Sequence, residues 1–213
     1  MANKYIIVFI SIFTISVFIK LYQNVNTEIQ PCNPYVYSRS VYVGNNRGNG
    51  TGVILNSKYI LTAKHVTNGQ GMVIVHRQEG EVGVFPVIYE SSEHDFSLIA
   101  NKSNNKDSVI KFNYNIISQE RACSVGNPTT GSFISANPIM LFISWGLGPS
   151  GEIDKYTMFL PGGVEAGFSG SGIFNNKDEL LSIVTWCGMG NSLCGGIPIQ
   201  TVKLELAETK FKL

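Results

Sequence analysis

The stretch Gly167-Phe168-Ser169-Gly170-Ser171-Gly172 places two serines among three glycines, and short runs of Val, Ile, Tyr and Phe surround it on both sides. Such runs, separated by clusters of Asn, Ser and Gly, are typical of β-strands joined by turns. Glycine supplies 22 of the 213 residues, which fits a chain rich in turns. We therefore expect an all-β fold in which this glycine-serine loop connects two strands.

The strand-like runs fall into two successive sets. The first set is 40–44, 51–55, 59–62, 72–76, 82–89 and 96–100; the second is 122–125, 133–145, 156–160, 172–174, 181–186 and 197–206. The run 133–145 should break into two strands at Asn137-Pro138, and only the last residues, 205–211, suggest a short helix. Two sets of about six antiparallel strands predict two closed six-stranded β-barrels, because closure removes the exposed edges of a sheet.

The N-terminus differs from the rest of the chain. Residues 5–19 carry no charge and lie between Lys4 and Lys20. As a helix they span about 22 Å, less than the ~30 Å hydrocarbon core of a bilayer, which is typical of a secretory signal. The residues that follow are too large for a signal-peptidase site, so an uncleaved anchor is favoured over a cleaved signal peptide. We expect a hydrophobic N-terminal helix. The protein would be membrane-anchored by this helix with the rest of the chain outside the cytoplasm, or secreted if the segment is cleaved.

These features divide the chain into three parts. Residues 1–22 form the signal-anchor or signal peptide, and residues 36–213 form the folded domain. Residues 23–35 are polar, contain Pro31 and Pro34 and lack periodicity, so they are expected to be a tether.

The four cysteines are Cys32, Cys123, Cys187 and Cys194. An even number is compatible with two disulfides in an oxidising compartment. Cys187 and Cys194 flank a turn rich in Gly and Asn, so proximity favours that pair, which leaves Cys32 for Cys123. A zinc site is the alternative, but the short paired spacings of zinc ligands are missing. We expect no metal and no cofactor.

Two earlier segments bear on the glycine-serine loop. They are Thr62-Ala63-Lys64-His65 and His94-Asp95-Phe96-Ser97-Leu98-Ile99. A lone His after a strand or an Asp before one is usually structural. Together with Ser169, however, they supply the groups of one mechanism. A serine hydroxyl becomes a nucleophile when an imidazole takes its proton, and a carboxylate fixes the tautomer of that imidazole.

In this order, the three segments resemble those of the trypsin and chymotrypsin-like serine peptidases, particularly their shorter bacterial and viral branches. That family carries Thr-Ala-x-His, Asp-(Ile/Phe)-(Ala/Ser)-Leu and Gly-x-Ser-Gly-(Gly/Ser)-(Pro/Gly), and the resemblance extends over residues 36–206. It implies a chymotrypsin-like pair of barrels and a serine endopeptidase that acts on polypeptides through an acyl-enzyme. The implied catalytic triad is His65, Asp95 and Ser169.

The resemblance also implies an oxyanion hole formed by the backbone N–H groups of Gly167 and Ser169. Ser171 is the competing nucleophile, but the family places its serine two residues after the first glycine. Phe168 stands where the digestive enzymes carry an Asp that pairs with a newly cut N-terminus, so activation by cleavage is not expected.

The substrate pocket of the family includes the residue six positions before the nucleophile, which is Gly163 here. Gly163 and Val164 carry no charge, and a buried Lys or Arg side chain would lack a partner. Glu165 follows them and is expected on the outer wall. The opposite strand would contribute Thr185, Trp186 and Cys187 through backbone pairing. The resemblance therefore implies a preference for uncharged, small to medium apolar residues before the cut bond.

Other functions are disfavoured by residue order and charge. The α/β-hydrolases need a His after their acid, and subtilisin-like enzymes need an Asp before their His, but His94 is the last His and Asp95 the first Asp. Metalloproteases need a His-Glu-x-x-His motif, which is missing. With 16 basic and 15 acidic residues, no nucleic-acid partner is expected. The alternative to a serine endopeptidase is a catalytically inactive two-barrel module that binds peptides or partners.

Overall fold

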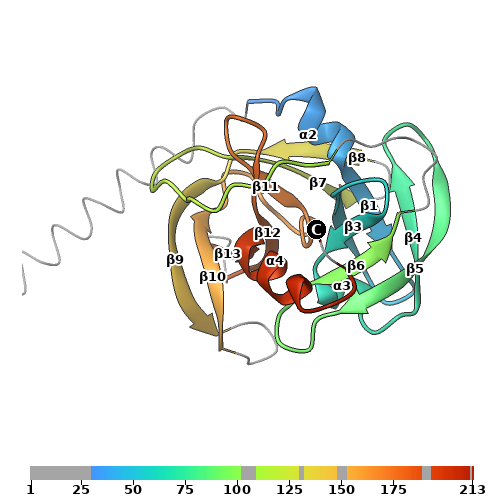
Figure 1. Cartoon of the computed structure of the whole chain (residues 1–213). Coiled ribbons are helices and arrows are strands. Elements are labelled where there is room, and N and C mark those ends of the chain that lie inside the picture. The colour runs from blue at the N-terminus through green and yellow to red at the C-terminus, as the bar shows by residue number, and fades with distance from the viewer. Residues whose placement is uncertain (1–29, 102–108, 130–131, 148–152, 189–192, 212) are drawn as a thin grey trace, which may run out of the picture.

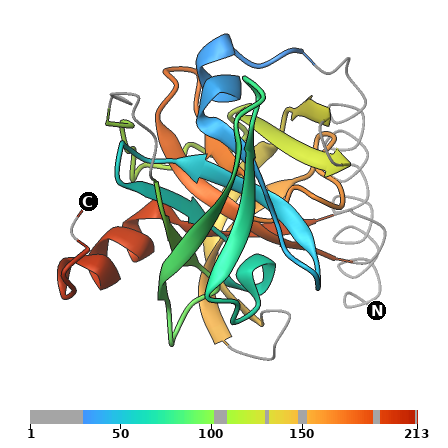
Figure 2. The same ribbon diagram turned by 90° about the vertical axis from the view of Figure 1, so that its right-hand side faces the viewer.

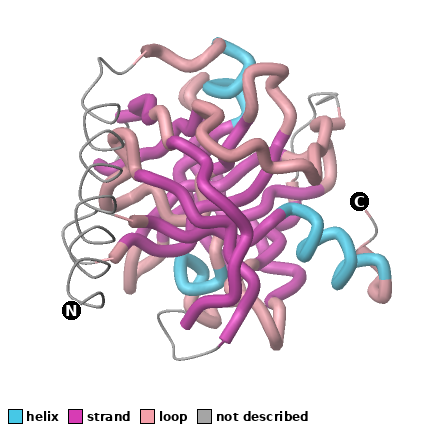
Figure 3. The backbone as a smooth tube through the Cα atoms, turned by 90° about the vertical axis from the view of Figure 1, so that its left-hand side faces the viewer, coloured by secondary structure: helices cyan, strands magenta, loops and turns pink. Residues whose placement is uncertain are grey.

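The computed structural model describes residues 30–101, 109–129, 132–147, 153–188, 193–211 and 213. Strands are the main secondary structure of these residues, and the helices lie at the outside (Figures 1 and 3). The helices are α2 (Pro34–Arg39), α3 (Lys64–Thr67) and α4 (Ile199–Ala207). The strands are β1 (Ser40–Gly44), β2 (Asn49–Ile54), β3 (Tyr59–Thr62), β4 (Met72–Arg77), β5 (Val82–Glu90), β6 (Ser97–Ala100), β7 (Cys123–Thr129), β8 (Ser132–Ala136), β9 (Ile139–Leu147), β10 (Ile153–Leu160), β11 (Gly172–Phe174), β12 (Leu180–Cys187) and β13 (Cys194–Pro198).

The first six strands form a closed antiparallel barrel in the order β1-β2-β3-β6-β5-β4. It closes where β1 pairs with β4, from Val41 opposite Arg77 to Gly44 opposite Ile74. Because successive side chains of a strand alternate between its two faces, every second residue enters the barrel. The interior is lined by Val41, Val43, Ile54, Ile60, Ala63, Val66, Val73, Val75, Phe85 and Ile99. The prediction of a six-stranded first barrel is confirmed.

The other seven strands form one open sheet in the order β8-β7-β11-β12-β13-β10-β9, so the prediction of a second closed six-stranded barrel is wrong. The expected break at Asn137-Pro138 is present, but its two halves pair with different neighbours, β8 with β7 and β9 with β10. Proline lacks an N–H group and interrupts the ladder at this corner. The halves therefore become the two edges of the sheet, and in the part of the chain that the structure describes no ladder joins β8 to β9.

The end of the chain also departs from the sequence prediction. Residues 197–206 were expected as a strand and 205–211 as a helix, but β13 ends at Pro198 and α4 runs from Ile199 to Ala207. Ile199, Val202 and Leu206 are fully buried at intervals of three and four residues, which is helical spacing. Proline at the cap stops the strand and is compatible with the start of a helix. In Figure 2, α4 lies at the outside of the strands, near the C-terminus.

The barrel and the open sheet share an apolar core, which fixes how their loops face each other. It contains Val53, Leu55, Leu61, Phe96 and Leu98 of the barrel region, Val125, Tyr156, Phe174, Leu180, Ile183 and Ile197 of the sheet, and Ile199, Val202 and Leu206 of α4. Because the interior of a protein is closely packed, the two halves are held in one arrangement.

The predicted hydrophobic N-terminal helix lies outside the described residues. Within those ranges, no helix is both long and apolar enough to cross a membrane. Of the segment expected to be a tether, Cys32 is buried and α2 begins at Pro34. Asn33 caps this helix by accepting from the Tyr35 N–H at 2.9 Å.

Candidate active site

His65 is the second residue of α3, which begins two residues after the end of strand β3. Its ring Nδ1 lies 2.7 Å from Asp95 Oδ2, and its backbone N–H donates to Asp95 Oδ1 at 3.0 Å. The side chain of Asp95 is 11% exposed and that of His65 is 45% exposed. A carboxylate at Nδ1 favours the tautomer that carries its proton there. The second ring nitrogen, Nε2, is then an acceptor and has no partner among the described residues.

The loop that carries Ser169 connects β10 to β11 and is docked on the barrel. Thr51 of β2 donates its backbone N–H to the Ser169 carbonyl at 2.8 Å and its hydroxyl to the Gly167 carbonyl at 2.7 Å. Gly170 has a φ of +85° and lies so close to the barrel that an added Cβ would be 2.8 Å from the Ala63 nitrogen. Ala63 is two residues before His65, so these contacts bring Ser169 to the His65 side of the barrel.

The Ser169 side chain lies in this loop and is partly exposed. In the part of the chain that the structure describes, its hydroxyl has no hydrogen bond, and neither it nor His65 Nε2 is joined to the other. The backbone N–H groups of Gly167 and Ser169 likewise donate to no group within the described ranges. Gly167 has a φ of +92°, a conformation that favours glycine. Two N–H groups of one loop that have no acceptor among the described residues are suited to an oxyanion.

Ser171, the competing nucleophile, is fully buried. Its hydroxyl pairs with Ser124 Oγ at 3.0 Å, and its backbone N–H donates to the Phe168 carbonyl at 2.8 Å. A substrate cannot reach this side chain without unfolding the sheet around it.

The residues expected in the substrate pocket are distributed over two elements. Gly163 is exposed with a φ of +100°, whereas the Val164 side chain is buried in the core of the open sheet. On β12, the Thr185 hydroxyl donates to the Gly195 carbonyl at 3.2 Å. Trp186 is half-buried and covers Gly195, where any side chain would collide with its ring.

The cysteines form two disulfides, Cys32–Cys123 and Cys187–Cys194, with sequence separations of 91 and 7 residues. The first ties the segment before α2 to β7, and the second links the end of β12 to the start of β13. Across the described ranges, no group of three or more His, Cys, Asp or Glu side chains is arranged to hold a metal ion.

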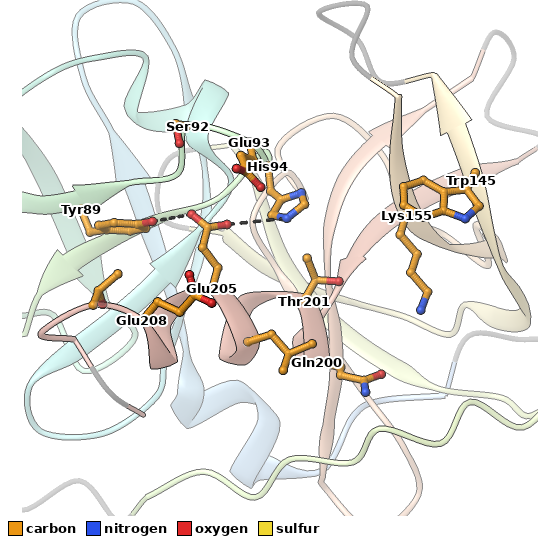
Figure 4. Close-up of a pocket in the computed structure, with 12 residues that line it drawn as sticks. Tyr89, Ser92, Glu93, His94, Trp145, Lys155, Gln200, Thr201, Glu205 and Glu208 are labelled. Carbon is orange, nitrogen blue, oxygen red and sulfur yellow. Dashed lines mark hydrogen bonds and ion pairs between the residues drawn. The ribbon is translucent and has the colours of Figure 1, made fainter.

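A cavity of about 390 Å³ opens beside His65, between α3 and the loop from Glu90 to Asp95. It shares Ser92, Glu93 and His94 with a larger cavity of about 770 Å³. Figure 4 shows that α4 and the strands carrying Trp145 and Lys155 line this larger cavity.

Sequence reasoning missed a polar cluster behind the Asp95 loop. Glu205 of α4 accepts from the Tyr89 hydroxyl and, at 2.9 Å, from the Ser91 hydroxyl. Burial, followed by the hydrogen bond to Glu205, raises the pKa of Tyr89 to about 12. These residues are 114 and 116 positions apart from Glu205 in the chain, and no local pattern connects them.

Comparisons with known proteins give the family and the fold of the chain. Residues 50–183 match the family model described as a trypsin-like peptidase domain. Among curated proteins no match was found. Three solved structures of proteases share the fold. Rv3671c from M. tuberculosis H37Rv, in its inactive form, has a TM-score of 0.72 and 16% identity, covering 85% of this chain and 96% of that one.

The HtrA-type protease AlgW, solved with a tripeptide, has a TM-score of 0.72 and 17% identity over 82% of this chain and 60% of its own. The serine endoprotease from Yersinia pestis has a TM-score of 0.66 and 22% identity over 83% and 66%. At these identities the likeness shows the fold, which is the chymotrypsin-like fold of HtrA-type serine proteases. The family model covers more than half of the chain, and this protein therefore belongs to the trypsin-like peptidase domain family.

Proposed function

We propose that the protein is a serine endopeptidase in which His65, Asp95 and Ser169 form the catalytic triad. The observation that carries the proposal is the His65–Asp95 pair, joined by two hydrogen bonds at 2.7 and 3.0 Å, on the barrel surface against which the Ser169 loop is docked. Family membership supports a polypeptide as the substrate.

In the proposed reaction, Ser169 Oγ attacks the carbonyl carbon of the peptide bond, and its proton passes to His65 Nε2. The negative oxygen of the tetrahedral intermediate accepts hydrogen bonds from the N–H groups of Gly167 and Ser169. His65 then gives its proton to the leaving amine as the C–N bond breaks, leaving an acyl group on Ser169. Water, activated by His65, hydrolyses this ester and restores the serine.

The proposal extends to the choice of residue before the cut bond. Gly163 supplies no charge, and the Val164 side chain is buried in the core rather than available to a substrate. Glu165 is exposed, as expected for the outer wall. The pairing edge is proposed to be residues 185–187 of β12, so uncharged, small to medium apolar residues should be preferred.

We also propose that the protein is anchored in a membrane by its N-terminal segment, with the peptidase domain outside the cytoplasm. The uncharged residues 5–19 support an anchor, and two disulfides favour an oxidising compartment. Carbonate extraction of membranes from expressing cells should leave the full chain in the pellet. Recovery of a shortened chain in the medium would show that the segment is cleaved and the domain secreted.

Cleavage of a peptide library by the full chain tests the peptidase activity. Ser169→Ala should lower turnover by several orders of magnitude, as removal of a triad serine does in other enzymes, while the melting temperature stays close to that of wild type. The alternative, a catalytically inactive module that binds peptides, is supported by the missing hydrogen bond between Ser169 Oγ and His65 in the described residues. Such a module would bind library peptides without cutting them.

A further inference from the structure

The carboxylate of Asp95 receives hydrogen bonds from His65 alone within the described part of the chain. A triad carboxylate needs a fixed position, because it sets the orientation of the imidazole. Among the described residues no other donor contacts its carboxylate, so the position of Asp95 depends on the backbone of the loop between β5 and β6. This loop is closed by backbone bonds from the Ser91 N–H to the Phe96 carbonyl and from the Phe96 N–H to the His94 carbonyl, both 3.0 Å long.

The side chain of Ser91 holds the middle of that loop. Its hydroxyl oxygen accepts from the N–H groups of Glu93 at 3.2 Å and His94 at 2.8 Å. A serine hydroxyl has two lone pairs and one proton, so these bonds use both lone pairs. The remaining proton is donated to Glu205 Oε2 at 2.9 Å. Ser91 is 1% exposed, so in the intact chain Glu205 and not bulk water accepts this proton.

Glu205 is placed to serve as that acceptor. It projects from α4 between Tyr89 and His94, as Figure 4 shows. Its Oε1 accepts from the Tyr89 hydroxyl, and its Oε2 lies 3.7 Å from His94 Nε2. Burial raises the pKa of Tyr89 to about 12, so this hydroxyl keeps its proton and remains a donor at neutral pH. The helix is itself fixed by buried Val202 and Leu206.

We propose that Glu205 is a positioning residue of the peptidase site: through Ser91 it holds the loop that carries Asp95, and thereby orients His65. This role rests on the proposed function. It links the C-terminal helix to a catalytic loop more than 100 residues earlier in the chain. A displacement of about 1 Å at a catalytic group can cost about 100-fold in rate.

The test compares the full chain with Glu205→Ala, Ser91→Ala and the double variant. Glu208→Ala, an exposed glutamate one turn further along, is the matched control. Loss of positioning should lower kcat by about tenfold or more for Glu205→Ala, with KM nearly unchanged, whereas Glu208→Ala should match wild type. Because both residues act through one hydrogen bond, the double variant should lose no more than the worse single variant.

Glu205→Gln is a second variant, which keeps the test decisive if Glu205→Ala fails to fold. Its amide oxygen can still accept from Ser91, and its amide nitrogen can donate to the Tyr89 oxygen, so most of kcat should be retained. A Gln variant as slow as the Ala variant, with both folded, would show that the Ser91 bond is not the cause of the loss.

Hydrogen exchange of the His65 amide gives a readout that does not require activity, since this N–H donates to Asp95 Oδ1. Measured on an otherwise unchanged Ser169→Ala chain, it should be faster with Glu205→Ala and unaltered with Glu208→Ala. If wild type cuts no peptide but this difference is seen, the proposed function fails and the positioning role stands. If wild type is active, and Glu205→Ala changes neither kcat nor the exchange of His65, the positioning role is refuted.

Discussion

Substitution of Gly170 by alanine tests the docking that brings Ser169 to the barrel. Gly170 has a φ of +85°, and an added Cβ would overlap the Thr51 carbonyl and the Thr62 hydroxyl and lie 2.8 Å from the Ala63 nitrogen. The backbone conformation costs an L-residue about 1–2 kcal/mol. Overpacking against atoms that cannot move adds about 1–3 kcal/mol. We therefore expect Gly170→Ala to lose about 2–5 kcal/mol of unfolding free energy.

Gly80 provides a matched control. Its φ is +88°, and an added Cβ would meet nothing within 4 Å. Gly80→Ala should therefore lose only the backbone cost of about 1–2 kcal/mol. At about 2–4 °C per kcal/mol for a domain of this size, Gly170→Ala should melt about 2–12 °C below Gly80→Ala.

Differential scanning calorimetry of both variants measures this gap, and the labelling rate of Ser169 by a fluorophosphonate reports the functional consequence. Gly170→Ala should also be slower in labelling at a temperature where it is fully folded, because relief of the overlap moves the neighbouring serine. Equal melting temperatures for the two alanine variants, with equal labelling rates, would refute the docking of this loop on residues 51–63.

Three further predictions follow from particular contacts. A library profile should favour uncharged, small to medium apolar residues before the cut bond; a profile dominated by Lys and Arg would contradict the proposed pocket. The raised pKa of Tyr89 stabilises the folded state below pH 10, and this contribution should be lost between about pH 10 and 12. Urea unfolding across that range should show a smaller loss of unfolding free energy for Tyr89→Phe than for wild type. Equal losses in the two proteins would argue against a raised Tyr89 pKa. From loop length alone, removing Cys32–Cys123 should cost about 4.5 kcal/mol and removing Cys187–Cys194 about 2.5 kcal/mol, so the reverse order in urea unfolding would contradict the chain-entropy estimate.

The first barrel could be predicted because its strands follow one another with short turns. Runs such as 40–44 and 59–62 coincide with β1 and β3, since alternation and turn residues are local signals. The openness of the second sheet could not be predicted in this way. It depends on which strands pair with β8 and β9, on either side of Pro138. This pairing is determined by contacts between residues distant in the chain.

The C-terminal helix α4 begins earlier than predicted, because its sequence is compatible with both a helix and a strand. Apolar residues at 199, 202 and 206 have helical spacing, but the run of Ile, Val and Leu around them also suits a strand. Packing of one helix face on the shared core decides between the two, because Ile199, Val202 and Leu206 are all fully buried there.

In the candidate site, too, local sequence patterns did not predict contacts between residues distant in the chain. The motifs around His65, Asp95 and Ser169 predict residue types and order, and the structure brings His65 and Asp95 into contact. The support of Asp95 by Ser91 and Glu205 has no motif, because it exists only once α4 has folded against the barrel.

Covalent labelling of the full chain by a fluorophosphonate, followed by mass mapping, tests the catalytic assignment most directly, because this reagent requires an activated serine. We predict a single adduct on Ser169, absent from Ser169→Ala and strongly slowed in His65→Ala. A folded protein that remains unlabelled, or a Ser169→Ala variant that is labelled as fast as wild type, would contradict the assignment.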